Sequence, residues 1–153
     1  MKLLVTGGLG FVGSNFILKL LTESSDYEII NVDAELFGAD HKNLSEIKNS
    51  KKYHFEKGNI TNKKFMEEQI ANCDAVINFA AETFVDRSIN DANPFLVSNI
   101  RGAYTILDII TKQKKRMIQI STDEVFGSLI DGTATEQSKL NPSSPYAATK
   151  AAA

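Results

Sequence analysis

The sequence has one cysteine, two histidines and no long apolar segment, and each scarcity excludes a class of protein. Because Cys73 has no partner in the chain, no internal disulfide can form, and a reducing cytoplasm is the simplest compartment. His41 and His54 are too few and too scattered for a histidine-based metal site, so no metal is expected. No segment reaches the roughly 18 apolar residues of a membrane span. Glycines from Gly7 onward interrupt the N-terminal apolar run, which argues against a signal peptide.

A strong charge of either sign is also missing. The formal net charge is -2 at pH 7, which offers no general electrostatic reason to expect nucleic acid or an anionic membrane as a partner. The one basic cluster, residues 112–116, falls where a helix is expected to end, and cations there offset the negative end of the helix dipole. A chain of 153 residues, 42% hydrophobic and 24% charged, suits one globular domain over residues 1–153.

Short apolar runs alternate with helical patterns along the chain. Strands are predicted at residues 2–6, 27–32, 52–58, 74–80 and 117–121. Helices are predicted at residues 11–21, 61–71, 93–113 and from Ser144 onward, with Thr61 capping the second helix and a long loop over residues 122–145. Apolar strands separated by helices imply a parallel sheet covered on both faces. Right-handed crossovers then predict an α/β, doubly wound (Rossmann) domain with strand order 3-2-1-4-5.

Three glycines, Gly7, Gly10 and Gly13, lie between the first strand and the first helix. In a dinucleotide-binding turn the first glycine permits the tight turn, the second lets the backbone approach a pyrophosphate, and the third lets the helix pack close to the sheet. The N-terminus of the helix then presents free N–H groups to the phosphates. A glycine-rich turn that binds nothing is the alternative, but the position between strand and helix favours a dinucleotide.

Asp33 ends the second strand, about 20 residues beyond Gly13. A carboxylate there accepts hydrogen bonds from the adenosine ribose hydroxyls and repels a 2′-phosphate, which favours NAD over NADP. The alternative is an aspartate that only caps a turn at the end of the strand. Glu35 nearby could share either role.

Tyr146 and Lys150 are spaced so that both side chains lie on one face of the last helix. A tyrosine with its ordinary pKa of about 10 is a poor base at neutral pH. A neighbouring ammonium and the positive nicotinamide ring of oxidised NAD favour the phenolate and lower that pKa. The pair could then take a hydroxyl proton while hydride leaves the same carbon. Such pairs also occur merely to stabilise a helix surface.

The long loop begins with Thr122, Asp123 and Glu124, directly after the fifth strand. Ligands of doubly wound sheets bind outside the carboxyl ends of the strands, near the point where the strand order reverses. Two adjacent carboxylates beside a sugar could divide the work of general acid and general base. Taken alone, such a pair is more often part of a solvated turn.

Four segments together resemble the dTDP-glucose 4,6-dehydratase family of extended short-chain dehydrogenases. They are residues 6–14 (TGGLGFVGS), 80–88 (AAETFVDRS), 121–125 (STDEV) and 142–146 (PSSPY), and the resemblance runs from residue 1 to residue 153. The glycine and Tyr/Lys motifs mark the wider superfamily, whereas the Asp-Glu pair is more specific. The resemblance implies NAD as cofactor, a nucleotide sugar as substrate and a homodimer in the complete parent protein.

The resemblance also implies a role for each matching catalytic residue. Tyr146, supported by Lys150, accepts the proton of the sugar 4-hydroxyl while C4 gives hydride to NAD. Glu124 removes the C5 proton as Asp123 protonates the departing 6-hydroxyl, and hydride then returns to C6. Thr122 hydrogen-bonds the 4-hydroxyl and helps to position the sugar.

Thr83 is expected to touch substrate or cofactor by the same resemblance. The residues expected to bind the cofactor are Gly7, Gly10, Phe11, Val12, Gly13, Asp33, Asn59, Ile60, Phe79, Ala80, Ala81, Thr83, Ser98, Tyr146 and Lys150. The sequence departs from the family pattern where Asn78 and Phe84 replace histidine, Asn59 replaces aspartate and Phe126 replaces tyrosine. None of these positions carries a chemical step, although Phe84 and Phe126 lack the polar groups of the family.

The family continues beyond the position of residue 153 through a sixth strand and a substrate domain. Residues 1–153 alone are therefore expected to bind NAD weakly and not to turn over a sugar nucleotide. Two alternatives to the dehydratase stay open: an epimerase or decarboxylase of the same superfamily, and an NAD-binding module with no catalysis.

Overall fold

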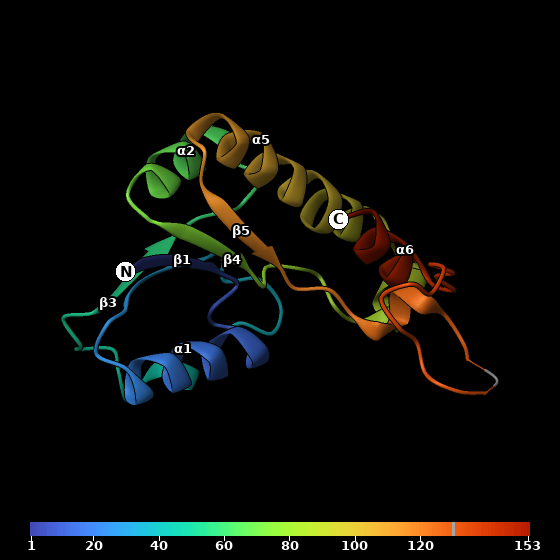
Figure 1. Cartoon of the computed structure of the whole chain (residues 1–153), viewed down its shortest axis with the longest axis horizontal. Helices are drawn as coiled ribbons and strands as arrows, with labels where there is room; N and C mark the ends of the chain where they lie inside the picture. Colours follow the sequence, from blue (N-terminus) through green and yellow to red (C-terminus); the bar gives the residue numbers. More distant parts are fainter. Residues whose placement is uncertain (130) are drawn as a thin grey trace.

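Five parallel strands form one sheet at the centre of the molecule (Figure 1). The computed structural model describes residues 1–129 and 131–153 and orders the strands β3-β2-β1-β4-β5, which confirms the predicted doubly wound order. The strands are β1 (Lys2–Thr6), β2 (Glu28–Asp33), β3 (Tyr53–Lys57), β4 (Ala75–Asn78) and β5 (Arg116–Gln119). Leu3 of β1 lies opposite Ile29 of β2 on one side and Ala75 of β4 on the other. The strand order reverses between β1 and β4, where a sheet of this kind accepts its ligands.

Helices cover both faces of this sheet. α1 (Phe11–Glu23) lies on one face, and α2 (Lys63–Ala71) and α5 (Ala103–Gln113) lie together on the other (Figure 1). α6 (Pro145–Ala152) packs beyond the carboxyl edge of the sheet, against α3 (Val85–Asn90). The shorter segments are η1 (His41–Leu44), α4 (Asn93–Phe95), the π-helical η2 (Leu96–Gly102) and η3 (Asp123–Phe126).

Alternate residues of the strands enter two hydrophobic clusters, one on each face of the sheet. In the first, Leu4 and Val76 pack against Met66 of α2 and Ile106 of α5. Cys73 belongs to this cluster, and burial raises the pKa of its thiol, as expected of a packing residue. The second cluster, on the side of α1, contains Leu3, Val5, Leu9, Ile17, Ile29, Leu44 and Ile77. Burial on both faces explains why these strands are apolar almost throughout.

The helix predicted over residues 93–113 is present but composite, because η2 lies between α4 and α5. α3 was not predicted, since six residues are too short to show a helical period. The loop predicted over residues 122–145 contains η3 and includes residue 130, which lies outside the described residues.

The cap of α2 differs from the expected one. Asn62 caps this helix, because its side chain accepts the N–H of Phe65 at 3.2 Å. The hydroxyl of Thr61 instead donates to the side-chain oxygen of Asn59 at 2.8 Å. The prediction of Thr61 as the cap was therefore wrong by one residue, since the threonine is engaged in the preceding turn.

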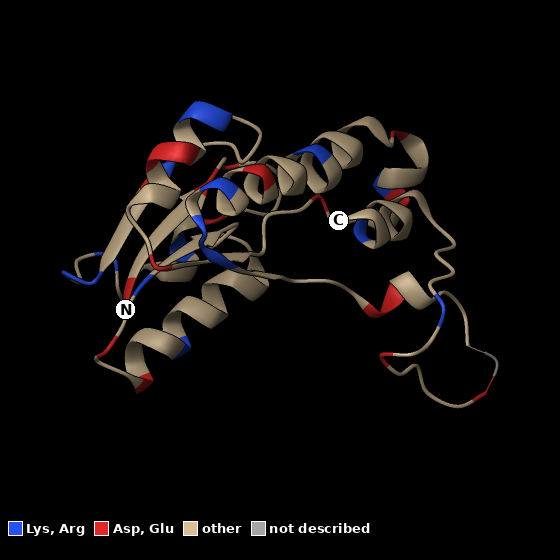
Figure 2. Cartoon of the chain, turned by 45° about the horizontal axis from the view of Figure 1, so that its top comes forward, with Lys and Arg blue, Asp and Glu red and all other residues tan. Residues whose placement is uncertain are grey.

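Basic and acidic residues are interspersed over the helices and loops (Figure 2). Lys63 of α2 and Lys112 of α5 both pair with Asp108, with Nζ to Oδ2 distances of 2.7 and 2.8 Å, so one carboxylate links the two helices. Among the described residues, no helix is long and apolar enough to cross a membrane. The same residues contain no group of three or more His, Cys, Asp and Glu side chains arranged to hold a metal ion.

Candidate active site

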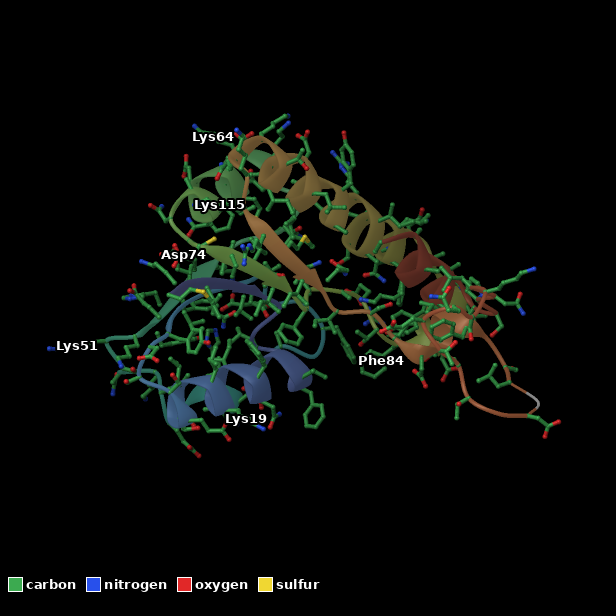
Figure 3. The ribbon with its side chains drawn as sticks, in the orientation of Figure 1. Lys19, Lys51, Lys64, Asp74, Phe84 and Lys115 are labelled. Atoms are coloured by element: carbon green, nitrogen blue, oxygen red, sulfur yellow. The ribbon has the colours of Figure 1, made fainter. Side chains whose placement is uncertain are left out.

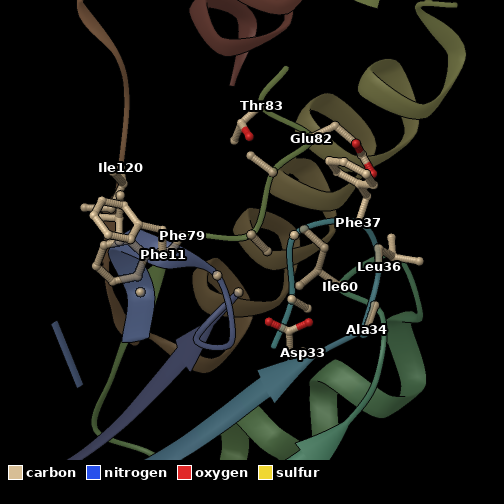
Figure 4. A pocket seen from close by; sticks show the side chains of 18 of the residues that line it. Phe11, Asp33, Ala34, Leu36, Phe37, Ile60, Phe79, Glu82, Thr83 and Ile120 are labelled. Carbon is tan, nitrogen blue, oxygen red and sulfur yellow. The ribbon is translucent and has the colours of Figure 1, made fainter. Parts of the chain in front are cut away.

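A cavity of about 450 Å³ opens at the carboxyl edge of the sheet. Its walls come from the glycine turn after β1, from the segments at the ends of β2, β3, β4 and β5, and from α6 (Figure 4). Every residue predicted to bind the cofactor lines this cavity except Ser98, which is half-buried in η2. The parallel sheet brings these residues together because the carboxyl ends of all its strands meet at one edge. Cofactor binding by them stays a prediction.

The turn after β1 leaves its backbone open to the cavity. Gly7 has a φ of +70°, and a Cβ there would lie 2.6 Å from the backbone nitrogen of Ala80. A Cβ on Gly10 would meet only the carbonyl of Gly7, 3.4 Å away. No side chain caps α1, so the N–H groups of its first turn are not taken up by a capping side chain. The turn therefore has the shape and the donors that a pyrophosphate requires.

Gly13 permits a different close contact from the expected one between the helix and the sheet. A Cβ there would lie 2.5 Å from the carbonyl oxygen of Gly7 and 3.0 Å from the Cα of Gly8. The close approach is therefore between the first turn of α1 and the glycine turn itself, rather than between the helix and the sheet. A side chain at this position would distort the turn and not only displace the helix.

Asp33 both closes a turn and faces the cavity, so its two interpretations are compatible (Figure 4). Its carboxylate accepts the N–H of Leu9 at 3.0 Å and the N–H of Glu35 at 2.8 Å. Each oxygen retains a lone pair for a ligand hydroxyl. Glu35 does not line the cavity: its carboxylate pairs with Lys57 and, at 2.6 Å, with Nε2 of His41, and these two partners hold its pKa below the ordinary value.

Two asparagines that depart from the family pattern are used inside the fold. Asn59 lines the cavity, and its side-chain oxygen accepts the N–H and the hydroxyl of Thr61 at 2.9 and 2.8 Å. Its amide N–H groups are the part suited to an adenine acceptor. Asn78 is buried, accepts a hydrogen bond from the hydroxyl of Thr6 and donates to Oε1 of Gln119 at 2.7 Å. Asn78 therefore joins β1, β4 and β5 and does not line the cavity.

α6 presents Tyr146 and Lys150 to the cavity from one face, as their spacing predicts. Both side chains are 7% exposed. Ser144 caps the helix, and the Ser88 hydroxyl oxygen in α3 accepts the N–H of Tyr146 at 3.0 Å. The ammonium of Lys150 donates to the carbonyl of Ile120 at 2.6 Å. These bonds hold the start of the helix and its lysine against the end of β5.

The pKa of Tyr146 is raised in the protein without ligand, whereas the lowered pKa predicted from the sequence applies when oxidised NAD is also bound. Burial raises this pKa most, a hydrogen bond with Thr122 opposes the rise, and the carboxylates of Glu124 and Asp123 add to it. Burial also lowers the pKa of the Lys150 ammonium, whose partner is a backbone carbonyl and not the phenol. Positive charge from a bound ligand, added to that of Lys150, would favour the phenolate.

The three residues predicted at the start of the long loop lie beside this phenol but outside the cavity lining. The side chain of Thr122 caps η3, accepting the N–H of Glu124 at 3.3 Å and donating to the carboxylate of Asp123 at 3.2 Å. Asp123 and Glu124 are exposed. The structure thus brings two exposed carboxylates and two hydroxyls next to the α6 wall of the cavity.

Several lining residues were not assigned from the sequence, and all lie at or just after the carboxyl end of a strand. They are Val32, Ala34, Leu36, Phe37, Gly38, Ala39, Gly58 and Ile120. The rule that ligands bind outside these strand ends would have pointed to them. Thr83 and Phe84, which follow β4, line the cavity as well, and Figure 3 shows Phe84 between α6 and the N-terminal end of α1.

Comparison with known proteins identifies the family. The family model described as GDP-mannose 4,6 dehydratase matches residues 4–153. The chain belongs to this family. Among curated relatives, a low-salt glycan biosynthesis protein of Haloferax volcanii is 42% identical over 154 residues, covering 100% of the chain and 49% of the relative. A dTDP-glucose 4,6-dehydratase of Mycolicibacterium smegmatis is also 42% identical, over 156 residues, covering 100% of the chain and 46% of the relative.

Solved structures of the same kind superpose closely. The dTDP-glucose 4,6-dehydratase DesIV of Streptomyces venezuelae, solved with NAD bound, has a TM-score of 0.95 and 39% identity, covering 99% of the chain and 49% of that protein. A UDP-glucuronic acid 4-epimerase of Bacillus cereus, also solved with NAD, has a TM-score of 0.90 and 29% identity, covering 99% and 49%. The resemblance predicted from the sequence is confirmed, and this member of the GDP-mannose 4,6 dehydratase family spans about half the length of the curated relatives it matches.

Proposed function

We propose that the complete protein is an NAD-dependent lyase that dehydrates a nucleotide-linked hexose, converting dTDP-glucose to dTDP-4-keto-6-deoxyglucose. One observation carries the proposal: two exposed carboxylates, Asp123 and Glu124, lie on η3, which packs against α6 beside a tyrosine that lines a cavity of ligand size. A dehydration needs a hydroxyl base together with a second acid and base, and this arrangement supplies all three. The curated relatives named dTDP-glucose 4,6-dehydratase support the choice of reaction.

The residues of the cavity fit NAD. The backbone at Gly10 leaves the space a pyrophosphate would occupy, and the uncapped N-terminus of α1 offers N–H donors there. Asp33 would accept the ribose hydroxyls, and its charge would repel a 2′-phosphate. NAD, when bound, supplies the hydride acceptor and donor. The solved relatives that hold NAD support this assignment.

The remaining chemistry is assigned to side chains of this chain. Tyr146 takes the proton of the sugar 4-hydroxyl as that carbon is oxidised, and Thr122, which lies beside the phenol, also holds the hydroxyl. The resulting ketone acidifies the C5 proton, which Glu124 removes while Asp123 protonates the departing 6-hydroxyl. One water leaves, the hydride returns to C6, and Glu124 gives a proton back to C5, which completes the 6-deoxy product. Lys150, fixed by the carbonyl of Ile120, adds positive charge to the site.

A 4-epimerase of the same superfamily is the second candidate, because an epimerase also superposes closely on the chain. Both reactions begin with oxidation at C4, so the cavity and Tyr146 do not separate them. The two carboxylates do, since an epimerase has no elimination for Asp123 and Glu124 to catalyse. A decarboxylase and an NAD-binding module without catalysis are the other outcomes of the test.

The test uses protein expressed from its complete coding sequence and assayed with dTDP-glucose and UDP-glucose. We expect a 4-keto-6-deoxy product and incorporation of solvent deuterium at C5. Glu124→Gln should lower the rate of C5 exchange by about 100-fold, the usual size of a general-base contribution. Glu136→Gln, an exposed carboxylate of the same loop, is the matched control and should exchange at the wild-type rate. A 4-epimer as the only product would exclude the dehydratase.

We further propose that residues 1–153 are the NAD-binding domain and that by themselves they turn over no sugar nucleotide. The support is that the curated relatives are about twice as long as this chain. Detectable 4-keto product from purified residues 1–153 would contradict this. Calorimetry with NAD on the same sample tests the binding.

We propose a homodimer for the complete protein, formed through the outer face of η2 and α5. Val97, Tyr104 and Leu107 recur at helical spacing on these segments, and all three are exposed. An exposed apolar stripe of this kind is typical of an interaction surface. Sedimentation should give a dimer for the wild type and a monomer for Tyr104→Glu combined with Leu107→Glu.

A further inference from the structure

Three side chains join two loops at the rim of the cavity. Phe37 lies in the loop after β2, whereas Phe84 and Arg87 follow β4. The rings of Phe37 and Phe84 meet edge to face with centroids 5.0 Å apart, and the guanidinium carbon of Arg87 lies 4.4 Å from the centroid of Phe37. The carboxylate of Glu82 holds Arg87 in place, with an Nη1 to Oε2 distance of 3.1 Å. Phe37, Phe84 and Arg87 are termed the rim bridge.

The contact between the two loops crosses the sheet edge at the place where a bound dinucleotide would also cross it. β1 lies between β2 and β4, so a contact between the loops after β2 and β4 passes across the end of β1, where the glycine turn lies. A dinucleotide reaching from Asp33 at the end of β2 to Tyr146 beyond β4 has to cross at the same place. Phe37 and Phe84 both line the cavity, and Figure 4 shows Phe37 beside Glu82 on one rim with Phe11 on the opposite one.

The rim bridge is not part of the hydrophobic core. Phe37 is 66% exposed and Phe84 is 49% exposed, and neither belongs to the two buried clusters. The contacts that Phe37 makes are those with Phe84 and Arg87, and the backbone of its loop turns at Glu35 and Gly38, which have positive φ values of 56° and 87°. The pairing of Glu35 with Lys57 secures that turn. Large aromatic side chains held in solvent at the mouth of a cavity point to a role toward a ligand.

We propose that the rim bridge retains bound NAD, because the two loops must separate before a dinucleotide can leave the cavity. This inference rests on the proposed function, in which hydride is taken from a sugar and returned to the same sugar. Loss of the reduced cofactor between the two transfers would strand the keto intermediate. Slow release is therefore a requirement of the reaction, and Phe37 and Arg87 are the residues that provide it.

The experiment measures release of NAD from the complete protein. The protein is loaded with radiolabelled NAD, chased with excess unlabelled NAD, and sampled over time by filter binding. Phe37→Ala should release the label about tenfold faster, since it removes both the cation–π and the edge-to-face contact. Arg87→Gln should release it about threefold faster, because it keeps a donor for Glu82 but loses the cation. Phe37→Tyr, which keeps the ring, should match the wild type.

The matched control is Ile89→Ala, which removes an equally exposed apolar side chain from α3 outside the cavity lining. If Phe37→Ala releases NAD at the wild-type rate, or if Ile89→Ala is as fast as Phe37→Ala, the rim bridge has no such role. If Phe37→Ala is fast but Arg87→Gln is unchanged, the phenylalanine acts by direct contact and the bridge is refuted. A wild type that retains no NAD refutes the proposed function, and the bridge with it.

Discussion

The two ends of the cavity are built in different ways. At the end formed by the turn after β1, the backbone sets the shape: Gly7 and Gly13 permit contacts that no side chain would allow, and Asp33 is held by two N–H groups. At the end formed by α6, side chains set the chemistry, and the phenol of Tyr146 sits in surroundings that disfavour its ionised form. The first end is complete before a ligand arrives, whereas the second acquires its function from the charge that the ligand brings.

The largest effect is expected from removing the reactive group while leaving the binding end intact. Tyr146→Phe should lower kcat for 4-keto product by about 1,000-fold, because the phenol is the only group assigned to the 4-hydroxyl proton. The affinity for NAD should change little, since most of the cofactor contacts lie at the other end. Tyr27→Phe, at a tyrosine just before β2 and outside the cavity lining, serves as the control. A parallel loss of NAD binding in Tyr146→Phe would show that the two ends are not separable.

Two alanine substitutions in the glycine turn test the other end of the cavity, where the backbone sets the shape. Gly7→Ala places a Cβ against Ala80 at a positive φ, and we expect it to lower the free energy of unfolding by about 2 kcal/mol. Gly10→Ala has room within the protein, so its stability should stay near that of the wild type. Its methyl group faces the cavity, and NAD affinity should fall about tenfold. Urea unfolding and calorimetry separate the two outcomes, and equal losses of stability would contradict the proposed cavity-facing role of Gly10.

The smallest of the expected effects is a shift in the pKa of the Tyr146 phenol. Burial and the carboxylates of Glu124 and Asp123 raise the pKa of Tyr146, so its phenolate forms only at higher pH than that of a free tyrosine. Glu124→Gln removes one of the negative charges and should shift that titration to lower pH. Saturating NAD should shift it further in the same direction, because the oxidised ring is positive. Ultraviolet titration, taken as the difference from Tyr146→Phe, measures both shifts, and a shift to higher pH would contradict the assignment.

Much of the fold and part of the candidate site could be predicted, because they depend on patterns among residues that are close in the sequence. Alternation of apolar runs and helical periods predicted all five strands in their order, and the Tyr146 and Lys150 spacing predicted their common face. The cap of α2 was misplaced because Thr61 and Asn62 are both good capping residues, and the turn at Asn59 decides between them. The raised pKa of Tyr146 in the protein without ligand was not predicted, for a different reason. Sequence spacing counts the lysine as a neighbour, but burial and the orientation of Lys150 toward Ile120 outweigh it.

The amino-acid sequence by itself determined the doubly wound sheet, the glycine turn and the identity of the residues that meet at its edge. Periodicity and the positions of strand ends depend on residues that are neighbours in the chain, so they can be derived from the sequence alone. Only the tertiary structure decided which of those residues face the cavity, that Gly13 packs on the turn, and that Phe37 reaches Arg87 across the end of β1. Contacts between residues far apart in the chain depend on how the loops close over the sheet, and no local pattern encodes that closure.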